Sequence, residues 1–282
     1  YVDQYELIAK ALSTSLGVPE ALMSRAGAVK CNSWLNTDIS IGNFPIVIYS
    51  HGHQSLKIAN TFQAEEIASN GYIVIAPDHT YDAALTIINE DKIIYTRSKL
   101  PNSDEEAEDS EMIKRVKEQL NIRVEDISFV IDKMIEKFSK DKQFNQSADF
   151  DNIGIFGHSF GGCTAIMAAN NDNRIDAILG LDAYFLPLPN YIIDKDINKP
   201  FVHLGQTSWG DSNNYELMKI WGSNNNQNSF HFSVEGSKHN DFTDFSQFTK
   251  LTRKFGSGKV PRKIMRNIMN DVMLQFFNYH LK

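Results

Sequence analysis

Six short apolar runs rich in β-branched residues, separated by stretches with helical periodicity, constrain the fold of this chain most. The runs occupy residues 44–50, 72–76, 152–156, 177–181, 201–205 and 229–234. Uninterrupted apolar runs of this length are typical of strands buried on both faces, as in a parallel sheet. Helical patterns cover residues 58–69, 160–169 and 263–281. This alternation predicts an α/β fold, with a mostly parallel central sheet and helices on both faces.

The length of the chain fits one large domain of this class. Its 282 residues contain no internal repeat and no low-complexity linker. We therefore expect a single domain over residues 1–282, with an N-terminal extension at 1–32 and an excursion of loop and helix at 80–140. Within the excursion, residues 80–102 are expected to form a loop. A helix should follow, with Ser103 and Glu106 forming a capping box at its start.

Composition and charge exclude some classes of protein. The net charge of −7 argues against a nucleic-acid partner, because neutralising phosphates requires clustered Lys and Arg. No apolar run approaches the roughly 18–20 residues that cross a bilayer. We expect Cys31 and Cys163 to remain unpaired, since Cys163 fits a small buried side chain in an apolar helix. Because the chain begins at Tyr1 rather than at Met, we expect an exported protein, periplasmic or extracellular, with a cytoplasmic location as the alternative.

The segment Gly157-His158-Ser159-Phe160-Gly161 contains the pattern G-x-S-x-G between an apolar strand and an apolar helix. In this context the pattern is typical of the nucleophile elbow of α/β hydrolases, where a tight turn holds a serine hydroxyl out of the sheet. The glycines leave room for the turn to close. The helix start places the amide of Phe160 where it can donate to an oxyanion. The pattern therefore predicts Ser159 as a nucleophile.

The partners of Ser159 are expected after other strands. In α/β hydrolases the catalytic residues follow in the order serine, acid, histidine, and His239 lies in the loop after the last predicted strand. Asp182 and Asp211 each follow a strand, and both remain candidates for the acid. The second oxyanion donor normally comes from the loop after an earlier strand, which indicates the backbone amide of His53.

Two alternatives compete with a serine hydrolase. His51 and His53 at one strand end, with Asp78 and His79 at the next, resemble the ligand spacing of a metal-dependent hydrolase. That interpretation supplies no further ligand set and leaves the elbow unexplained. The other alternative is a binding protein that kept an α/β-hydrolase fold and lost catalysis.

Three segments carry a resemblance to a known family: residues 157–162 (GHSFGG), 181–187 (LDAYFLP) and 238–245 (KHNDFTDF). They resemble the nucleophile, acid and histidine segments of the platelet-activating-factor acetylhydrolase family, and the resemblance extends over roughly residues 33–280. It implies an α/β-hydrolase fold, Asp182 rather than Asp211 as the acid, and the amides of His53 and Phe160 as oxyanion donors. His53 stands where that family usually has an apolar residue.

The predicted chemistry is two-step acyl transfer to water, with no metal and no organic cofactor. His239 would deprotonate Ser159, and Asp182 would orient the imidazolium. The expected substrate is a small ester or a phospholipid with a short acyl chain of the platelet-activating-factor type, with transient contact to a lipid surface. The apolar run at 184–193, led by Tyr184 and Phe185, has two interpretations: it lines the substrate pocket, or it packs against the sheet.

Overall fold

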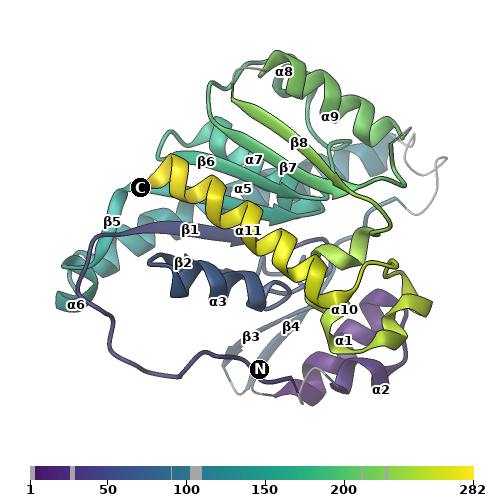
Figure 1. Ribbon diagram of the computed structural model, residues 1–282, viewed down its shortest axis with the longest axis horizontal. Helices are drawn as coiled ribbons and strands as arrows, with labels where there is room; N and C mark the ends of the chain where they lie inside the picture. Colours follow the sequence, from purple (N-terminus) through teal and green to yellow (C-terminus); the bar gives the residue numbers. More distant parts are fainter. Residues whose placement is uncertain (1–3, 26–28, 90, 102–109, 211, 226–227) are drawn as a thin grey trace.

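The computed structural model describes residues 4–25, 29–89, 91–101, 110–210, 212–225 and 228–282. A six-stranded sheet runs through its centre in the order β2-β1-β5-β6-β7-β8, and every neighbouring pair is parallel (Figure 1). Its strands are β1 (Phe44–Ser50), β2 (Ile73–Ile75), β5 (Ala148–His158), β6 (Ile175–Leu181), β7 (Phe201–Gln206) and β8 (Ser229–Val234). Each of the six predicted runs forms one of these strands. The predicted fold class is confirmed.

Helices cover both faces of the sheet. One face packs against α5 (Ser110–Phe138), α7 (Phe160–Asn171), α8 (Asn190–Ile193) and α9 (Asn213–Asn224). The other face packs against α3 (Thr61–Ser69) and α11 (Arg262–Leu281), and α11 crosses the sheet in the foreground of Figure 1. Both layers are dominated by side chains that are almost fully buried, so the central strands are covered on both faces. The edge strand β8 differs from the expectation of a strand buried on both faces, because most of its residues are exposed.

The excursion after β2 contains a feature that the sequence analysis missed. Residues 80–102 were expected to form a loop, but β3 (Leu85–Asn89) and β4 (Lys92–Tyr95) pair there as an antiparallel hairpin. The two strands are short, and the adjacent isoleucines in each of them break the strict alternation of apolar and polar residues that would indicate a half-buried hairpin. The predicted capping box of Ser103 and Glu106 lies outside the described residues.

The remaining helices are short and lie around the carboxyl edge of the sheet or at the ends of longer elements. The N-terminal part forms α1 (Tyr5–Leu16) and α2 (Glu20–Met23), which pack against α10 (Phe245–Phe248) near the lower right of Figure 1. Other short helices are α6 (Lys142–Asn145), η2 (His239–Phe242) and η3 (Lys250–Phe255). Within the described ranges, no helix has the length and apolar character needed to cross a membrane.

Candidate active site

Ser159 lies at the turn between β5 and α7, as its sequence context predicted. Its backbone has φ 55° and ψ −121°, a conformation that L-residues rarely adopt and that is typical of strained functional turns. The amide of Ser159 donates to the carbonyl of Leu181 at 3.0 Å, and its carbonyl accepts from the amide of Tyr184 at 2.9 Å. The neighbouring strand ends therefore hold this turn in place.

Two glycines allow the turn to close. A Cβ atom on Gly157 would overlap the backbone of Gly161, and a Cβ atom on Gly161 would overlap the carbonyl of Ser50 at the end of β1. Only glycine fits at both positions, since the obstacles are backbone atoms that cannot move aside. The first and fifth positions of G-x-S-x-G are thus explained by close backbone approach.

His239 and Asp182 meet at the carboxyl edge of the sheet although 57 residues separate them. Nδ1 of His239 lies 2.6 Å from Oδ2 of Asp182. A carboxylate can only accept, so Nδ1 carries the proton and Nε2 is left as the free acceptor. His239 is thereby held in the tautomer that a general base requires. Asp182 follows β6, and His239 follows β8.

The carboxylate of Asp182 is fully buried and accepts from three residues. Besides His239, it accepts from the amide of Gln206 at 3.1 Å, from Nε2 of Gln206 at 2.6 Å and from the hydroxyl of Tyr215 at 2.6 Å. Burial alone would raise the pKa of Asp182. The hydrogen bond and charge of His239, with the hydroxyl of Tyr215, outweigh burial and hold that pKa well below its usual range. The group is ionised at neutral pH.

Two rings flank the imidazole of His239. The ring of His158 lies 4.5 Å away, centroid to centroid, and that of Trp209 is stacked at 4.8 Å with an interplanar angle of 26°. Nε2 of His158 donates to the carbonyl of His239 at 3.1 Å. Burial lowers the pKa of His158 to about 3, so this ring stays neutral while it donates. The backbone and the ring plane of His239 are both fixed.

The two amides predicted as oxyanion donors lie on either side of Ser159 in the fold. His53 follows β1, and Phe160 is the first residue of α7. Within the described ranges, neither amide donates to a protein acceptor. Gly52 lies against this point, since a Cβ atom placed on it would be 3.4 Å from Cβ of Ser159. Both amides are therefore available to a ligand oxygen.

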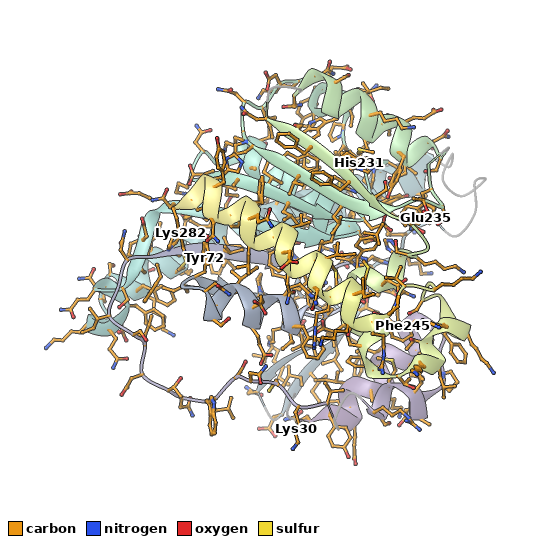
Figure 2. All side chains as sticks on the ribbon, in the orientation of Figure 1. Lys30, Tyr72, His231, Glu235, Phe245 and Lys282 are labelled. Carbon is orange, nitrogen blue, oxygen red and sulfur yellow. The ribbon has the colours of Figure 1, made fainter. Side chains whose placement is uncertain are left out.

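A cavity of about 140 Å³ contains Ser159 and His239 together. His53 and His158 supply polar atoms to its wall. The rest of the lining is mostly apolar and comes from the N-terminal helices, the segment after β1 and α10: Ile8, Leu12, Met23, Leu56, Phe245 and Phe248. Phe245 is labelled in Figure 2, beside those N-terminal helices. The site thus combines a few polar groups with an apolar wall, as small-molecule sites do.

The aromatic pair predicted as pocket residues lies elsewhere. Phe185 is fully buried in the core under α9, where its ring meets Phe201 at 6.4 Å, edge to face. Neither Tyr184 nor Phe185 lines the cavity that contains Ser159. The amide of Phe185 donates to Oδ1 of Asn214 at 2.6 Å, which turns the chain away from the cavity directly after Asp182. Of the two interpretations, Tyr184 and Phe185 therefore follow the second: they pack against the core of the sheet. Asp211, the other candidate acid, lies outside the described residues.

The histidines of the metal alternative are engaged in protein hydrogen bonds. Nε2 of His51 accepts from the amide of His79 at 3.0 Å, so Nδ1 is the protonated nitrogen that donates to the carbonyl of Gly52 at 2.7 Å. The ring of His79 contacts Asp126 and Ser50 through its two nitrogens. In the described part of the chain, no three His, Cys, Asp or Glu side chains are grouped as a ligand set. His51 and His53 are not brought together as ligands.

Several residues around the site carried no sequence signal of their own. Tyr215 and Gln206 contact Asp182 across 33 and 24 residues, and Trp209 stacks on His239. Each lies on or after β7, in a segment whose polar and aromatic residues fit an ordinary strand end and helix start. Only the positions of their neighbours in space identify them. His158 could have been noticed as the residue before Ser159, the predicted nucleophile.

Comparison with known proteins shows the family of this chain. Residues 5–282 match the family model described as platelet-activating factor acetylhydrolase, isoform II. The platelet-activating factor acetylhydrolase of Canis lupus familiaris is 27% identical over 293 residues, which cover 96% of this chain and 66% of that protein. The enzyme of the same name from Gallus gallus is 25% identical over 306 residues, covering 96% of this chain and 71% of that protein. This chain therefore spans about two thirds of the length of these relatives.

Solved structures agree on the fold. A ferulic acid esterase from Streptomyces cinnamoneus superposes with a TM-score of 0.71 at 22% identity, covering 100% of this chain and 80% of that one. A Thermus thermophilus protein, TT1662, has a TM-score of 0.53 at 13% identity, covering 84% of this chain and 90% of that one. These similarities establish an α/β-hydrolase fold, and the family match supports ester hydrolysis as the general activity. The chain belongs to the family of platelet-activating factor acetylhydrolases, isoform II.

Proposed function

We propose that this protein hydrolyses carboxylic esters through an acyl-enzyme formed on Ser159. His239 accepts the proton of the Ser159 hydroxyl at Nε2 as the oxygen attacks the ester carbonyl. Asp182 stabilises the imidazolium that forms, and the amides of His53 and Phe160 donate to the oxyanion. His239 then returns the proton to the leaving alcohol. Water, deprotonated by the same imidazole, releases the acid.

One observation carries this proposal most directly: His239 is held by Asp182 with its free nitrogen available, in a cavity that it shares with Ser159. A binding protein that had lost catalysis would have no need for a buried, ionised carboxylate aimed at one histidine nitrogen. Burying Asp182 costs free energy that only its four hydrogen bonds offset.

The proposed substrate is a phospholipid with a short acyl chain, of the platelet-activating-factor type. The cavity beside Ser159 is small and mainly apolar, so it suits a short hydrocarbon group better than a long chain. The names of relatives point the same way. One of them, from Arthroderma benhamiae, is described as a probable 1-alkyl-2-acetylglycerophosphocholine esterase and is 23% identical over 214 residues.

A fluorophosphonate probe tests the mechanism, because only an activated serine reacts with it. The wild-type protein should be labelled at Ser159, and the Ser159→Ala variant should not. That variant should also lose about 10⁵–10⁶ in kcat on a soluble ester. Ser69→Ala serves as the matched control, since Ser69 is an exposed residue at the end of α3, and it should be labelled like the wild type.

Three results would contradict the proposal. Retention of more than about a hundredth of the activity in Ser159→Ala would exclude Ser159 as the nucleophile. Loss of wild-type activity with a chelator, restored by zinc, would favour the metal alternative. A panel of esters with acyl chains from acetyl to octanoyl, with and without a phosphocholine head group, tests the substrate. Equal rates on every member would contradict the proposed preference for short-acyl phospholipids.

A further inference from the structure

Arg123 is a buried arginine that lies outside the candidate triad. It belongs to α5 and its side chain is only 1% exposed. Its Nη2 atom donates to the backbone carbonyl of His51 and to Oγ of Ser50 at 3.2 Å. Both acceptors lie at the end of β1, directly before the segment that carries the amide of His53. A guanidinium this deeply buried is costly unless it is well bonded, which indicates a specific role.

A third acceptor of Arg123, Asp82, connects it to the same loop. Nη1 of Arg123 donates to Oδ2 of Asp82 at 3.3 Å, and the other oxygen of Asp82 accepts from the amide of Gln54 at 3.4 Å. Asp82 is 6% exposed, so this ion pair is shielded from water. Gln54 has φ 49°, in the left-handed region. Arg123 is thus connected to residues on both sides of His53.

His79 supports the arrangement from the other side. Its ring lies 3.0 Å from Oγ of Ser50 and 2.9 Å from Asp126, and its backbone amide donates to the ring of His51. Ser50, His79 and Asp126 thus show the contacts of a serine–histidine–aspartate triad. Ser50 is fully buried and does not line the adjacent cavity, so substrate has no access to it. These three residues hold the loop and do not react.

Arg123 also contacts the residue that carries the other oxyanion amide. The guanidinium carbon lies 4.8 Å from the centre of the Phe160 ring, as in a cation–π contact. Phe160 is fully buried, and its ring is held between this guanidinium and the core of the sheet. One planar side chain therefore contacts the end of β1 through hydrogen bonds and the start of α7 through its face.

Several other backbone groups of the loop after β1 are also hydrogen-bonded. The carbonyl of Gly52 accepts from Ser55, the carbonyl of Gln54 from the hydroxyl of Ser15 on α1, and the carbonyl of Ser55 from the amide of Ala84. Every one of these bonds fixes the backbone on either side of His53. Within the described ranges the His53 amide donates to no protein acceptor, and His53 lines the cavity that contains Ser159.

From these contacts we infer that Arg123 is a positioning residue for the oxyanion site. It sets the distance between the two donor amides, of His53 and Phe160, by bonding to both segments that carry them. Donors that stabilise a developing oxyanion must be held in place before the reaction, because reorganisation during the reaction would cost most of the benefit. This inference rests on the proposed function.

Two variants test whether Arg123 positions the oxyanion donors or only supports the fold. Arg123→Lys keeps the charge beside Asp82 but cannot bond in a planar fork or stack on Phe160. The double variant Arg123→Met/Asp82→Asn removes both buried charges, so neither is left unpaired. In either variant kcat on a soluble ester should fall about 10- to 100-fold, somewhat less than the loss of a whole oxyanion donor. KM should stay within about threefold, since the interaction with the oxyanion exists only in the transition state.

A boronic acid that forms a tetrahedral adduct with serine gives the decisive measurement. Its affinity should fall by the same factor as kcat/KM, and the pH midpoint of kcat/KM should stay unchanged because His239 and Asp182 are untouched. Arg115→Met on the exposed face of the same helix is the matched control and should behave as the wild type. Hydrogen exchange of residues 50–55 should be faster in the folded Arg123 variants than in the control.

The outcomes are distinguishable. A wild-type protein that no fluorophosphonate labels would refute the proposed function, and this inference with it. A labelled wild type, together with folded Arg123 variants that keep kcat and boronic acid affinity within about threefold, would refute only the role of Arg123. A loss confined to KM would also refute it, since misplaced oxyanion donors act on kcat. Arg123→Lys, the milder change, keeps the test valid where the double variant does not fold.

Discussion

The hydroxyl of Tyr215 donates to Oδ1 of Asp182 at 2.6 Å, on the opposite side of the carboxylate from His239. Both partners are buried, and burial together with the Asp182 charge raises the pKa of Tyr215, so its proton stays in place. This contact joins α9 to the end of β6. It fixes the carboxylate that in turn fixes the imidazole.

Replacing Tyr215 by phenylalanine should therefore affect both stability and rate. Tyr215→Phe keeps the ring packing but removes a hydrogen bond to a charged group, which should lower the free energy of unfolding by about 1.5–3 kcal/mol. Urea unfolding measures that loss. We expect kcat to fall about tenfold, because Asp182 becomes less well oriented toward His239. A variant as active and as stable as the wild type would contradict the importance of this bond.

Asparagine substitutions decide which aspartate is the acid. Asp182→Asn should preserve the fold and allow the wrong tautomer of His239, costing about 10³–10⁴ in kcat. Asp211→Asn is the matched control, since Asp211 lies in a polar stretch rich in turn-forming residues, and it should cost less than about tenfold. One soluble ester is enough to measure both. The reverse order of effects would move the acid to Asp211.

The stability that the Asp182 carboxylate contributes to the wild-type protein should depend on pH. The pKa of Asp182 is depressed in the folded state, so its ionised form stabilises the protein above the unfolded pKa of about 3.9, and this contribution disappears as pH falls toward the folded value. The gap in unfolding free energy between wild type and Asp182→Asn should be constant from pH 7 to about pH 5 and narrow below pH 4. Denaturant titrations across this range measure it. A gap that widens in acid would contradict the depressed pKa.

The pH dependence of activity should reflect His239. His239 accepts a proton only in its neutral form, so kcat/KM should rise with pH on the acid side and then level off. His158 has a pKa lowered by burial to about 3, and Asp182 is also held ionised, so neither titrates near neutrality. His158→Gln should lower the rate but leave the midpoint of the profile where it is in the wild type. A displaced midpoint, or a flat profile from pH 5 to 8, would exclude this assignment.

The apolar wall of the cavity should set the acyl length. Leu12 on α1 lines the cavity, and Leu12→Trp should shorten the space beside Ser159. We expect kcat/KM for an acetyl ester to change less than about threefold and that for a hexanoyl ester to fall at least tenfold, since each misplaced methylene costs roughly 10-fold or more. Lys10→Trp, on the exposed face of α1, is the control and should leave both rates unchanged. Equal losses for both esters would point to misfolding.

The fold and the turn at Ser159 could be predicted from the sequence because their signals are local. The run at Phe44–Ser50 coincides with β1, which is buried along nearly its whole length, as an apolar strand inside a parallel sheet should be. The run at Ser229–Val234 also forms a strand, β8, but β8 lies at the edge of the sheet and is exposed over most of its length. The turn at Ser159 was predictable because Gly157 and Gly161 are required by backbone contacts within or next to the turn itself. The hairpin of β3 and β4 lacked such a local pattern.

The surroundings of the catalytic residues were decided only by the tertiary structure. The residue context left Asp182 and Asp211 open, and only the family resemblance favoured Asp182. The side-by-side packing of β6, β7 and β8 brings Asp182 within 2.6 Å of His239. Arg123 was one polar residue in an amphipathic helix, yet it contacts His51 across 72 residues. Such contacts depend on which segments become neighbours as the sheet assembles, and no local pattern records that arrangement. Local physics determined the strands and the elbow, and long-range packing determined what surrounds the serine.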